Sequence, residues 1–481
     1  MSSRKRPTTS SRRLCGRPCR RSDPTRPTLA PFRLTRNADR ARAVLTELYD
    51  AAVTGAAPGP VTAAALRDFP ARTEQRIWLY ALGKAAYPMA ASAAAMLQRA
   101  LLRIAGGIIV GEEIEASPYA TVVAMRGDHP LPGRHSFTAA EKIGAMTTGM
   151  RADDVAIVLL SGGVSSLIAA PLRGMAESDL GQLFELLLAS GLDIHDMNAV
   201  RKRFLRWGAG RLALALAPAR TYAFIMSDVP GDDPASIGSG PCTPDVVTAR
   251  QVTERLQRAG LYSRIAPAMR DHLASVVRGV LPETPKPSHP AFAHVSTKII
   301  GRNALALDAV CTQATSLDLD VERVATPLSG DAATSGDRIA TTLIERAASA
   351  TRRTCIVWGG ETTVQLGHDG SGSVTAADTP PSGGRCQELA LAAARRLSQG
   401  GDAATRITLL AAGTDGRDGT TDAAGAFADA SLWSTIRESG YDPDLALQRH
   451  ESHAVLGATH SLFPRRSTGT NVMDVVIGII E

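Results

Sequence analysis

The sequence feature that most restricts the fold is a repeated unit: a short apolar run ends in a glycine-rich polar loop, and a helical stretch follows. One such unit is Asp154–Leu160 with the loop Ser161–Ser166, and another is Arg406–Ala412 with the loop Gly413–Gly419. Apolar runs of this length suit buried strands, and strands that alternate with helices form a mostly parallel sheet with helices on both faces. The pattern therefore predicts an α/β fold of the doubly wound, Rossmann-like type.

The length of 481 residues predicts two domains, because a single hydrophobic core rarely grows that large. The Pro- and Ser-rich segment Leu281–Pro290 interrupts the strand–helix pattern, which resumes near Lys298. We expect a larger N-terminal domain with a mostly parallel sheet over residues 37–285 and a smaller C-terminal α/β domain over residues 295–481. Residues 1–36 are rich in Arg, Ser and Pro and almost free of apolar residues, so we expect a disordered basic tail.

The charge distribution does not predict a nucleic-acid partner. The overall charge is +6, but residues 1–36 carry +10, which leaves −4 for the remainder of the chain. No apolar run approaches the roughly 18 residues of a membrane span, and the tail lacks the apolar segment of a secretory signal. The tail is interpreted as an organelle-targeting peptide, a basic interaction tail or an extension from a misassigned start codon, and we favour the last.

The six cysteines predict neither a disulfide framework nor a metal site. The first two lie close together within the basic tail, without paired ligands downstream. The other four are expected to be single thiols in a reducing compartment, which suggests a cytoplasmic protein. The six are Cys15, Cys19, Cys242, Cys311, Cys355 and Cys386.

The polar loops that follow the strands are the candidate ligand-binding segments. In open α/β sheets ligands bind beyond the carboxyl ends of the strands, so these loops should line one cleft. The loop Ser161-Gly-Gly163, followed by Ser165 and Ser166, opens a predicted helix, where N–H groups and hydroxyls can cradle a phosphate. The alternative is an ordinary tight strand–helix turn, and the sequence does not separate the two.

A second loop is strongly acidic. Asp228, Asp232 and Asp233 place three carboxylates within six residues, and Mg²⁺ in phosphate sites usually takes one or two carboxylates besides substrate oxygens. The alternative is that these residues cap their own backbone in Asx turns. The turn Gly238–Gly240 follows directly and adds a further candidate for phosphate contact.

Two cations stand out. Lys84 lies at a strand–helix turn among small neighbours, so it is either a surface charge or a ligand for an anion, and we favour the anion ligand. Arg385 begins a predicted helix, where the macrodipole disfavours a cation. Its position suggests attraction by a carboxylate or a transferring phosphate that it can hold bidentately. Asp415 and Asp418 form another acidic cluster after the strand Arg406–Ala412.

Taken together, the motifs resemble the glycerate 2-kinase family, which has also been labelled hydroxypyruvate reductase and whose C-terminal part is called the MOFRL domain. They occur in the family's order and cover nearly the whole chain from residue 37 onward. The motifs are Leu82-Gly-Lys-Ala-Ala86, Gly127-Asp-His-Pro-Leu-Pro132, Leu160-Ser-Gly-Gly-Val-Ser-Ser-Leu167, Asn198-Ala-Val-Arg-Lys202, Ser227-Asp-Val-Pro-Gly-Asp-Asp-Pro234, Ser239-Gly-Pro241, Gly359-Gly-Glu-Thr-Thr-Val364, Gly383-Gly-Arg385 with Gln387-Glu388, Gly413-Thr-Asp-Gly416 with Asp422-Ala-Ala-Gly425, and Gly469-Thr-Asn471.

The resemblance implies an active site between two α/β domains and transfer of the γ-phosphoryl of Mg-ATP to the 2-hydroxyl of D-glycerate, which gives 2-phosphoglycerate and ADP. Lys84 and Arg385 match the family's catalytic cations, and Glu361 and Asp228 match its active-site carboxylates. Phosphoryl transfer depends on positioning and charge neutralisation, which suits these residues. Asp228, or less readily Asp232, is expected to hold Mg²⁺ or to accept the hydroxyl proton.

The chain has no Gly-x4-Gly-Lys-Ser/Thr sequence, so several Gly- and Ser-rich loops are expected to hold ATP instead. The oligomeric state is left open, with a homodimer as one alternative. The residues expected at the nucleotide are Ser161, Gly162, Gly163, Ser165, Ser166, Gly238, Ser239, Gly240, Gly359, Gly360, Gly413, Thr414 and Asp415.

The chain departs from the family pattern at four places, one of which is a shortened segment before Gly469. Arg203–Ala213 lacks the family's His and one Lys, Cys386 replaces an Asn, and Asp369–Ser382 lengthens a loop. These changes leave a second hypothesis, a family member that binds a sugar acid or nucleotide without turnover. A reductase is disfavoured because no Gly-x-Gly-x-x-Gly with a later ribose-binding acid follows an early strand. Nucleic-acid binding through the tail is the remaining alternative.

Overall fold

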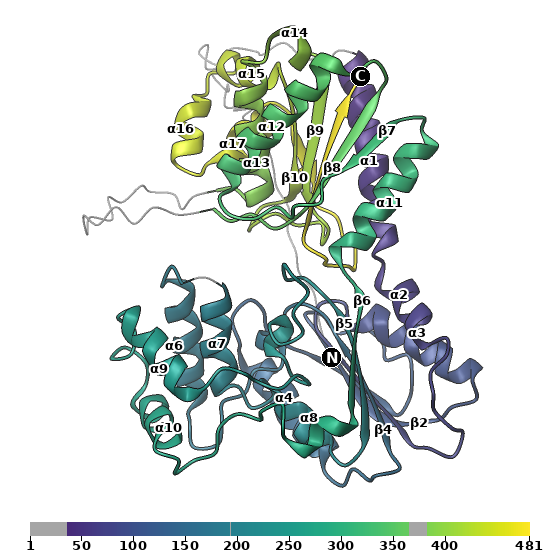
Figure 1. Ribbon diagram of the computed structural model, residues 1–481, viewed down its shortest axis with the longest axis vertical. Helices are drawn as coiled ribbons and strands as arrows, with labels where there is room; N and C mark the ends of the chain where they lie inside the picture. Colours follow the sequence, from purple (N-terminus) through teal and green to yellow (C-terminus); the bar gives the residue numbers. More distant parts are fainter. Residues whose placement is uncertain (1–35, 193, 365–381) are drawn as a thin grey trace, which may run out of the picture.

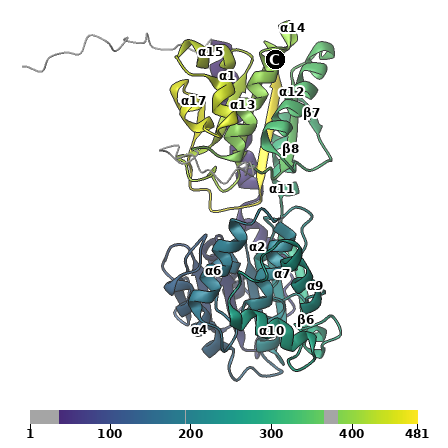
Figure 2. The same cartoon turned by 90° about the vertical axis from the view of Figure 1, so that its left-hand side faces the viewer.

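The computed structural model describes residues 36–192, 194–364 and 382–481. Nearly all of the expected basic tail, with Cys15 and Cys19, and all but the last residue of the expected loop insertion Asp369–Ser382 lie outside the described residues. Figures 1 and 2 show two lobes, each built around one sheet. The prediction of a two-part α/β fold is thereby confirmed.

The first sheet has six strands in the order β3-β2-β1-β4-β5-β6, and all its neighbouring strands run parallel. This is the order of doubly wound nucleotide-binding sheets, whose switch point lies between β1 and β4. The predicted parallel sheet is therefore confirmed. The strands are β1 (Ile77–Leu82), β2 (Ile104–Gly111), β3 (Val122–Arg126), β4 (Val155–Leu160), β5 (Arg220–Met226) and β6 (Val295–Gly301).

Helices cover both faces of this sheet, and its central strands β1 and β4 are apolar and buried on both sides. On β1, Leu79 and Ala81 pack into one core with α3, whereas Tyr80 and Leu82 pack into another with α4 and α8. A satellite core joins α6, α7, α9 and α10. The helices are α2 (Pro58–Leu66), α3 (Ala86–Arg99), α4 (Arg134–Thr147), α5 (Val164–Leu167), α6 (Glu177–Leu188), α7 (Ile194–Phe204), α8 (Arg211–Leu216), α9 (Ala249–Arg258) and α10 (Pro267–Val277), with the 3-10 turns η1 (Ile237–Ser239) and η2 (Pro290–His294).

The second sheet has the order β11-β10-β9-β12-β8-β7 and is mostly antiparallel. Its central strand β12 runs antiparallel to both β8 and β9, so the first residue of β12 lies beside the last residues of its neighbours. The strands are β7 (Asp320–Arg323), β8 (Thr354–Gly360), β9 (Ile407–Gly413), β10 (Ala423–Asp429), β11 (Leu462–Pro464) and β12 (Asp474–Ile480).

Two layers of helices enclose the second sheet. One face carries α12 and α13, while α11 and α1, from the beginning of the described chain, lie on the other (Figure 1). The helices of this lobe are α1 (Arg36–Gly55), α11 (Asn303–Ser316), α12 (Ala332–Ser349), α13 (Arg385–Leu397), α14 (Gly401–Ala404), α15 (Leu432–Glu438), α16 (Pro443–Gln448) and α17 (Ser452–Ala458).

The chain therefore crosses between the lobes twice, once after α1 and once after β6. The hydroxyl of Tyr49 on α1 donates to the carbonyl of Gly413 at 2.8 Å, and Thr470 Oγ1 donates to the carbonyl of Ala56 at 2.7 Å. β6 pairs with β5 in the first sheet, although it falls within the range 295–481 expected for the second domain. The boundary between residues 285 and 295 stays a prediction.

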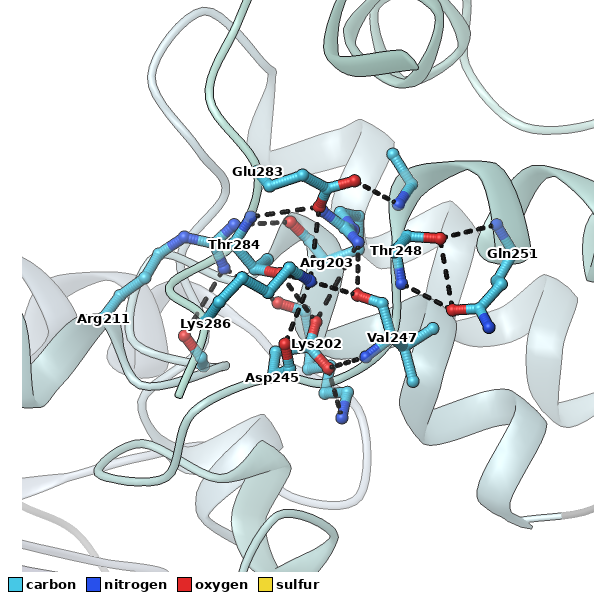
Figure 3. Close-up of polar contacts among 12 residues, drawn as sticks. Lys202, Arg203, Arg211, Asp245, Val247, Thr248, Gln251, Glu283, Thr284 and Lys286 are labelled. Carbon is cyan, nitrogen blue, oxygen red and sulfur yellow. Dashed lines mark hydrogen bonds and ion pairs between the residues drawn. The ribbon is translucent and has the colours of Figure 1, made fainter. Parts of the chain in front are cut away.

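The region that departs from the family pattern lies in a buried polar network at the end of α7 (Figure 3). Arg203 is 1% exposed, and its guanidinium donates to Glu283 Oε2 at 2.6 Å and to the carbonyl of Val247 at 2.9 Å. Its neighbour Lys202 pairs with Asp245 at 2.8 Å. Arg203 thus ties α7 to the segment before α9 and to the segment after α10.

The same region also supports a loop of the expected nucleotide site. The N–H groups of Ala209 and Gly210 donate to the carbonyls of Ser239 and Gly240, both at 2.8 Å. Arg211 donates to the carbonyls of the α7 end, including Lys202 at 3.0 Å. The changed residues therefore have structural partners that fix the backbone of this loop.

We predict that Arg203→Met lowers the free energy of unfolding by about 3 kcal/mol, because it removes a buried guanidinium that makes charge-assisted hydrogen bonds to Glu283 and to the carbonyl of Val247. The control is Arg206→Met, which removes a partly exposed ion pair with Glu141 and should cost less than about 1 kcal/mol. Urea denaturation of both variants checks the prediction. Equal losses in the two variants would contradict it.

Candidate functional site

Both sheets direct their loop-bearing edges toward the space between the lobes. Lys84, after β1, lies with its Nζ 4.0 Å from Oδ2 of Asp415, after β9. Glu112, after β2, lies with its Oε2 3.2 Å from Nη1 of Arg417. These contacts join the first lobe to the second, so the loops of the two sheets line a common inter-lobe cleft.

Arg385 is the best-held cation of the cleft. It is the first residue of α13, and its Nε and Nη2 donate to the two carboxylate oxygens of Asp474 at 2.6 and 2.7 Å. Burial alone would lower the pKa of Arg385, but Asp474 and Glu361 hold it well above its ordinary value. Asp474 is the carboxylate that draws this cation to the helix start, so the guanidinium stays charged and fixed.

Glu361 lies beside this pair, with its Oε1 3.2 Å from Arg385 Nη1. Burial raises the pKa of Glu361 to about 7, against the opposing effect of Arg385. The nearby charges of Asp474, Asp228 and Asp415 raise it further. A carboxyl group with a pKa near neutrality can take up and release a proton during a reaction.

The first turn of α13 is capped by Asp418, which is 1% exposed. Its carboxylate accepts hydrogen bonds from the N–H groups of Cys386 at 3.1 Å and Gln387 at 2.8 Å. A Cβ at Gly384 would lie 2.2 Å from the Asp418 carboxylate carbon, so only glycine allows this approach. Burial raises the pKa of Asp418 to about 6 despite these bonds. The cap fixes the backbone that carries Arg385.

Asp228 lies on the other side of the cleft, at the end of β5. A Cβ built on Gly162 would fall 1.9 Å from Asp228 Oδ2, so the glycine loop after β4 makes room for this carboxylate. Burial raises the pKa of Asp228, while the charges of Lys84 and His129 oppose the rise. The structure thus brings Lys84, Asp228, Glu361 and Arg385 into one electrostatically coupled group.

Several residues expected at the nucleotide already have partners within the protein. Ser161 Oγ accepts from the N–H of Ala85 at 2.9 Å, which fixes the loop that carries Lys84. Ser166 Oγ donates to the carbonyl of Pro130, and Thr414 Oγ1 donates to that of Met473. These hydroxyls shape the loops rather than point freely into the cleft.

The loops after β4 and β5 are joined directly. Ser165 Oγ lies 2.7 Å from Ser239 Oγ, with Gly238 and Gly240 on either side in left-handed backbone. In the second lobe, Gly359 and Gly360 end β8 and Gly413 ends β9. The residues expected at the nucleotide therefore come from both lobes.

The three carboxylates of the acidic loop after β5 have different surroundings. Asp232 Oδ2 lies 4.0 Å from Arg302 Nη1, and Asp233 accepts hydrogen bonds from the N–H of Ala235 and the hydroxyl of Ser236. In the described part of the chain, no group of three or more His, Cys, Asp or Glu side chains is arranged to hold a metal ion. Asp228 is the carboxylate of this loop that faces Lys84.

Sequence reasoning did not find Asp474, Glu112, His129 or Arg417. Asp474 follows the motif Gly469-Thr-Asn471 and precedes the apolar run Val475–Ile480, so an acid at the start of a strand was the available signal. Glu112 directly follows β2, which places it on the same edge as Lys84. The contact of Arg417 with Glu112 joins segments far apart in the sequence, and the contact of His129 with Glu112 joins the ends of two neighbouring strands.

The fold and the site define a two-lobed α/β protein with a charged inter-lobe cleft, and known proteins share this organisation. The family described as "Domain of unknown function (DUF4147)" matches residues 44–274, and the MOFRL family matches residues 354–474. None of the helices in the described ranges is long and apolar enough to cross a membrane.

Named relatives extend the match over most of the chain. A D-glycerate 2-kinase of Thermotoga maritima is 32% identical over 84% of this chain and 91% of that protein. An Agrobacterium vitis protein with the provisional name hydroxypyruvate reductase is 34% identical over 92% of this chain and 95% of that protein. A crystal structure of glycerate kinase from Thermotoga maritima superposes with a TM-score of 0.76 at 29% identity, covering 92% of this chain and all of that one. The chain belongs to the glycerate kinase family with a C-terminal MOFRL domain.

We predict a pH-dependent stability difference between the wild type and Glu361→Gln. Burial raises the pKa of Glu361 from 4.5 to about 7, so its stabilising contribution is present below pH 4.5 and is lost as the pH rises through 7. Because about a third of the side chain is exposed, we expect the variant to gain only about 2 kcal/mol on the wild type between pH 4.5 and 8.

Urea denaturation at a series of pH values measures this difference, because the titration of groups remote from Glu361 cancels between the two proteins, and the difference reports Glu361 with the carboxylates coupled to it. Glu438→Gln, which changes an exposed carboxylate of the same lobe, serves as the control and should follow the wild type. A constant difference between Glu361→Gln and the wild type over this pH range would contradict the prediction.

Proposed function

We propose that this chain is a glycerate 2-kinase that transfers the γ-phosphoryl group of ATP to the 2-hydroxyl of D-glycerate. The products are 2-phospho-D-glycerate and ADP. The observation that carries the proposal is the pair of cations on the two sides of the cleft, Lys84 from the first lobe and Arg385 from the second. The names of the relatives support the choice of substrate.

Lys84 and Arg385 would both neutralise negative charge on the reacting phosphate groups and the glycerate. Phosphoryl transfer depends chiefly on such neutralisation. Two nitrogens of Arg385 are held by Asp474, so the third, now beside Glu361, is available to the transferring phosphoryl group or the glycerate carboxylate. Lys84 is held more loosely, at 4.0 Å from Asp415. Its ammonium group can therefore turn toward a phosphate that enters the cleft.

Glu361 is our candidate for the group that accepts the hydroxyl proton. In the reaction, the 2-hydroxyl oxygen bonds to the γ-phosphorus, the bond to the β,γ-bridging oxygen breaks, and the hydroxyl proton passes to the base. A base works best when its pKa lies near the operating pH, and burial raises the pKa of Glu361 to about 7. Asp228, considered for this role from the sequence, remains the alternative.

Mg²⁺ would accompany ATP and neutralise charge on its phosphates. Asp228 fits this role because it is a carboxylate whose pKa burial raises, and a bound cation would favour its ionised form. Asp232, which faces Arg302, is the second candidate. The Gly and Ser loops named above would contact the phosphates mainly through Ser165, Ser239 and backbone N–H groups.

A reductase is the competing function because two relatives from Agrobacterium vitis carry that provisional name. The order of the first sheet would suit a dinucleotide. The turn after β1 reads Gly83-Lys-Ala-Ala86, however, and lacks the spaced glycines that bring a pyrophosphate close to the backbone. Its lysine instead suits a triphosphate. The free thiols of the described cysteines agree with the cytoplasmic location that we propose for the enzyme.

We predict robust release of ADP from Mg-ATP and D-glycerate by the wild type, with 2-phosphoglycerate as the product. Lys84→Ala should lower kcat by about 10³-fold, because it removes a cation from the developing charge. A coupled ADP-release assay with identification of the phosphoglycerate isomer measures both. Lys142→Ala, an exposed lysine of α4, is the control and should keep the wild-type rate.

Either of two results would contradict the proposal. The first is the absence of phosphoglycerate while ATP or glycerate still binds, which would favour a binding protein without turnover. The second is full activity in Lys84→Ala, which would retain the reaction but remove the proposed role of the lysine.

A further inference from the structure

A pocket of about 480 Å³ opens at the carboxyl ends of β2 and β3, next to the loop that carries Lys84. Glu112, Glu113 and Ile114 line it from the end of β2, and Arg126 and His129 line it from the end of β3. Arg417 of the second lobe completes the wall. The volume is in the range of small-molecule sites, and the proposed reaction chemistry leaves this pocket without a role.

The place of the pocket in the sheet indicates what it can bind. In sheets with the order found here, phosphates bind at the turn after the first strand and an acid that follows the next strand holds the ribose hydroxyls. Here Lys84 follows β1 and Glu112 directly follows the adjacent β2. The N–H of Gly83 donates to the carbonyl of Val110, which keeps the two loops side by side.

The chemistry of the lining fits a nucleoside. The contact between Glu112 Oε1 and His129 Nδ1 at 3.1 Å is the main cause that lowers the pKa of Glu112 to about 2, and Lys84 and Arg417 add to this effect, so Glu112 is an ionised acceptor. A vicinal diol offers two donors to such a carboxylate. Ile114 is 63% exposed, which leaves an apolar surface for a base.

We infer that this pocket binds the nucleoside part of ATP, with the ribose hydroxyls on Glu112 and the base against Ile114. The inference rests on the proposed kinase function and adds the position of the nucleotide to it. The phosphates then extend across the loop after β1 to Lys84. Arg417 donates to Glu112 from the second lobe. It would lie at the edge of the bound nucleoside, which would compete with it for the Glu112 carboxylate.

The test is a comparison of ADP with 2′-deoxy-ADP by titration calorimetry without glycerate. The wild type should bind ADP about tenfold more tightly, since a hydrogen bond to an ionised acceptor is lost in the deoxy form. Glu112→Gln should lose most of this preference. Glu185→Gln, an exposed carboxylate of α6, should keep it.

A second variant is independent of the contacts that Glu112 makes. Ile114→Ser replaces the apolar side chain with a small polar one and leaves Glu112 unchanged. It should weaken the binding of both nucleotides about fivefold while the preference for ADP stays. The inference is overturned if the wild type binds both nucleotides equally and Ile114→Ser binds ADP like the wild type. If the wild type and Ile114→Ser nevertheless phosphorylate glycerate, the proposed function stands without this pocket. If the wild type neither binds ADP nor turns over ATP, both proposals fail.

Discussion

The bidentate ion pair between Arg385 and Asp474 is the interaction on which the candidate site depends. Asp474 is the first residue of the central strand β12, and Arg385 is the first residue of α13, so the pair fixes a helix to the middle of the sheet. A buried ion pair is costly unless its hydrogen bonds are satisfied. Here both carboxylate oxygens are used, and Asp418 caps the helix behind the cation. The remaining guanidinium nitrogen of Arg385 lies beside Glu361. The ion pair with Asp474 fixes the direction of this nitrogen.

The second requirement is that two lobes meet at the edges where their loops emerge. The parallel sheet places Lys84 and Asp228 on one edge, whereas the second sheet achieves the same result with an antiparallel strand, because β12 starts where β8 and β9 end. The packing of α1 on the second sheet and the passage from β6 to α11 tie the lobes together twice. A cleft of this kind can admit two substrates and still surround the transferring group with charges from both sides. This arrangement is the physical basis of the proposed kinase.

The sequence predicted the parts that local pattern determines. Strands β1 and β4 were predictable because each is a short apolar run that ends at a glycine-containing loop. Arg385 was singled out because a cation at a helix start requires a partner. That partner, Asp474, was not predictable, since an acid before a strand is common and the contact spans a long stretch of chain. No local pattern indicates that α1, which precedes the first sheet in the chain, packs on the second sheet. Likewise, no local signal separates Asp228, which faces Lys84, from Asp232, which faces Arg302. The loops expected at the nucleotide stay predictions.

The measurement that tests this account most directly is a double-mutant cycle on kcat with Arg385→Ala and Asp474→Asn. If Asp474 acts by holding the guanidinium, Asp474→Asn alone should lower kcat by about tenfold or more, and it should have little further effect in the Arg385→Ala background. Retained secondary structure by circular dichroism in all three variants ensures that the comparison concerns folded protein. If Asp474→Asn lowers kcat by the same factor in both backgrounds, the account is contradicted, because Asp474 would then act independently of Arg385.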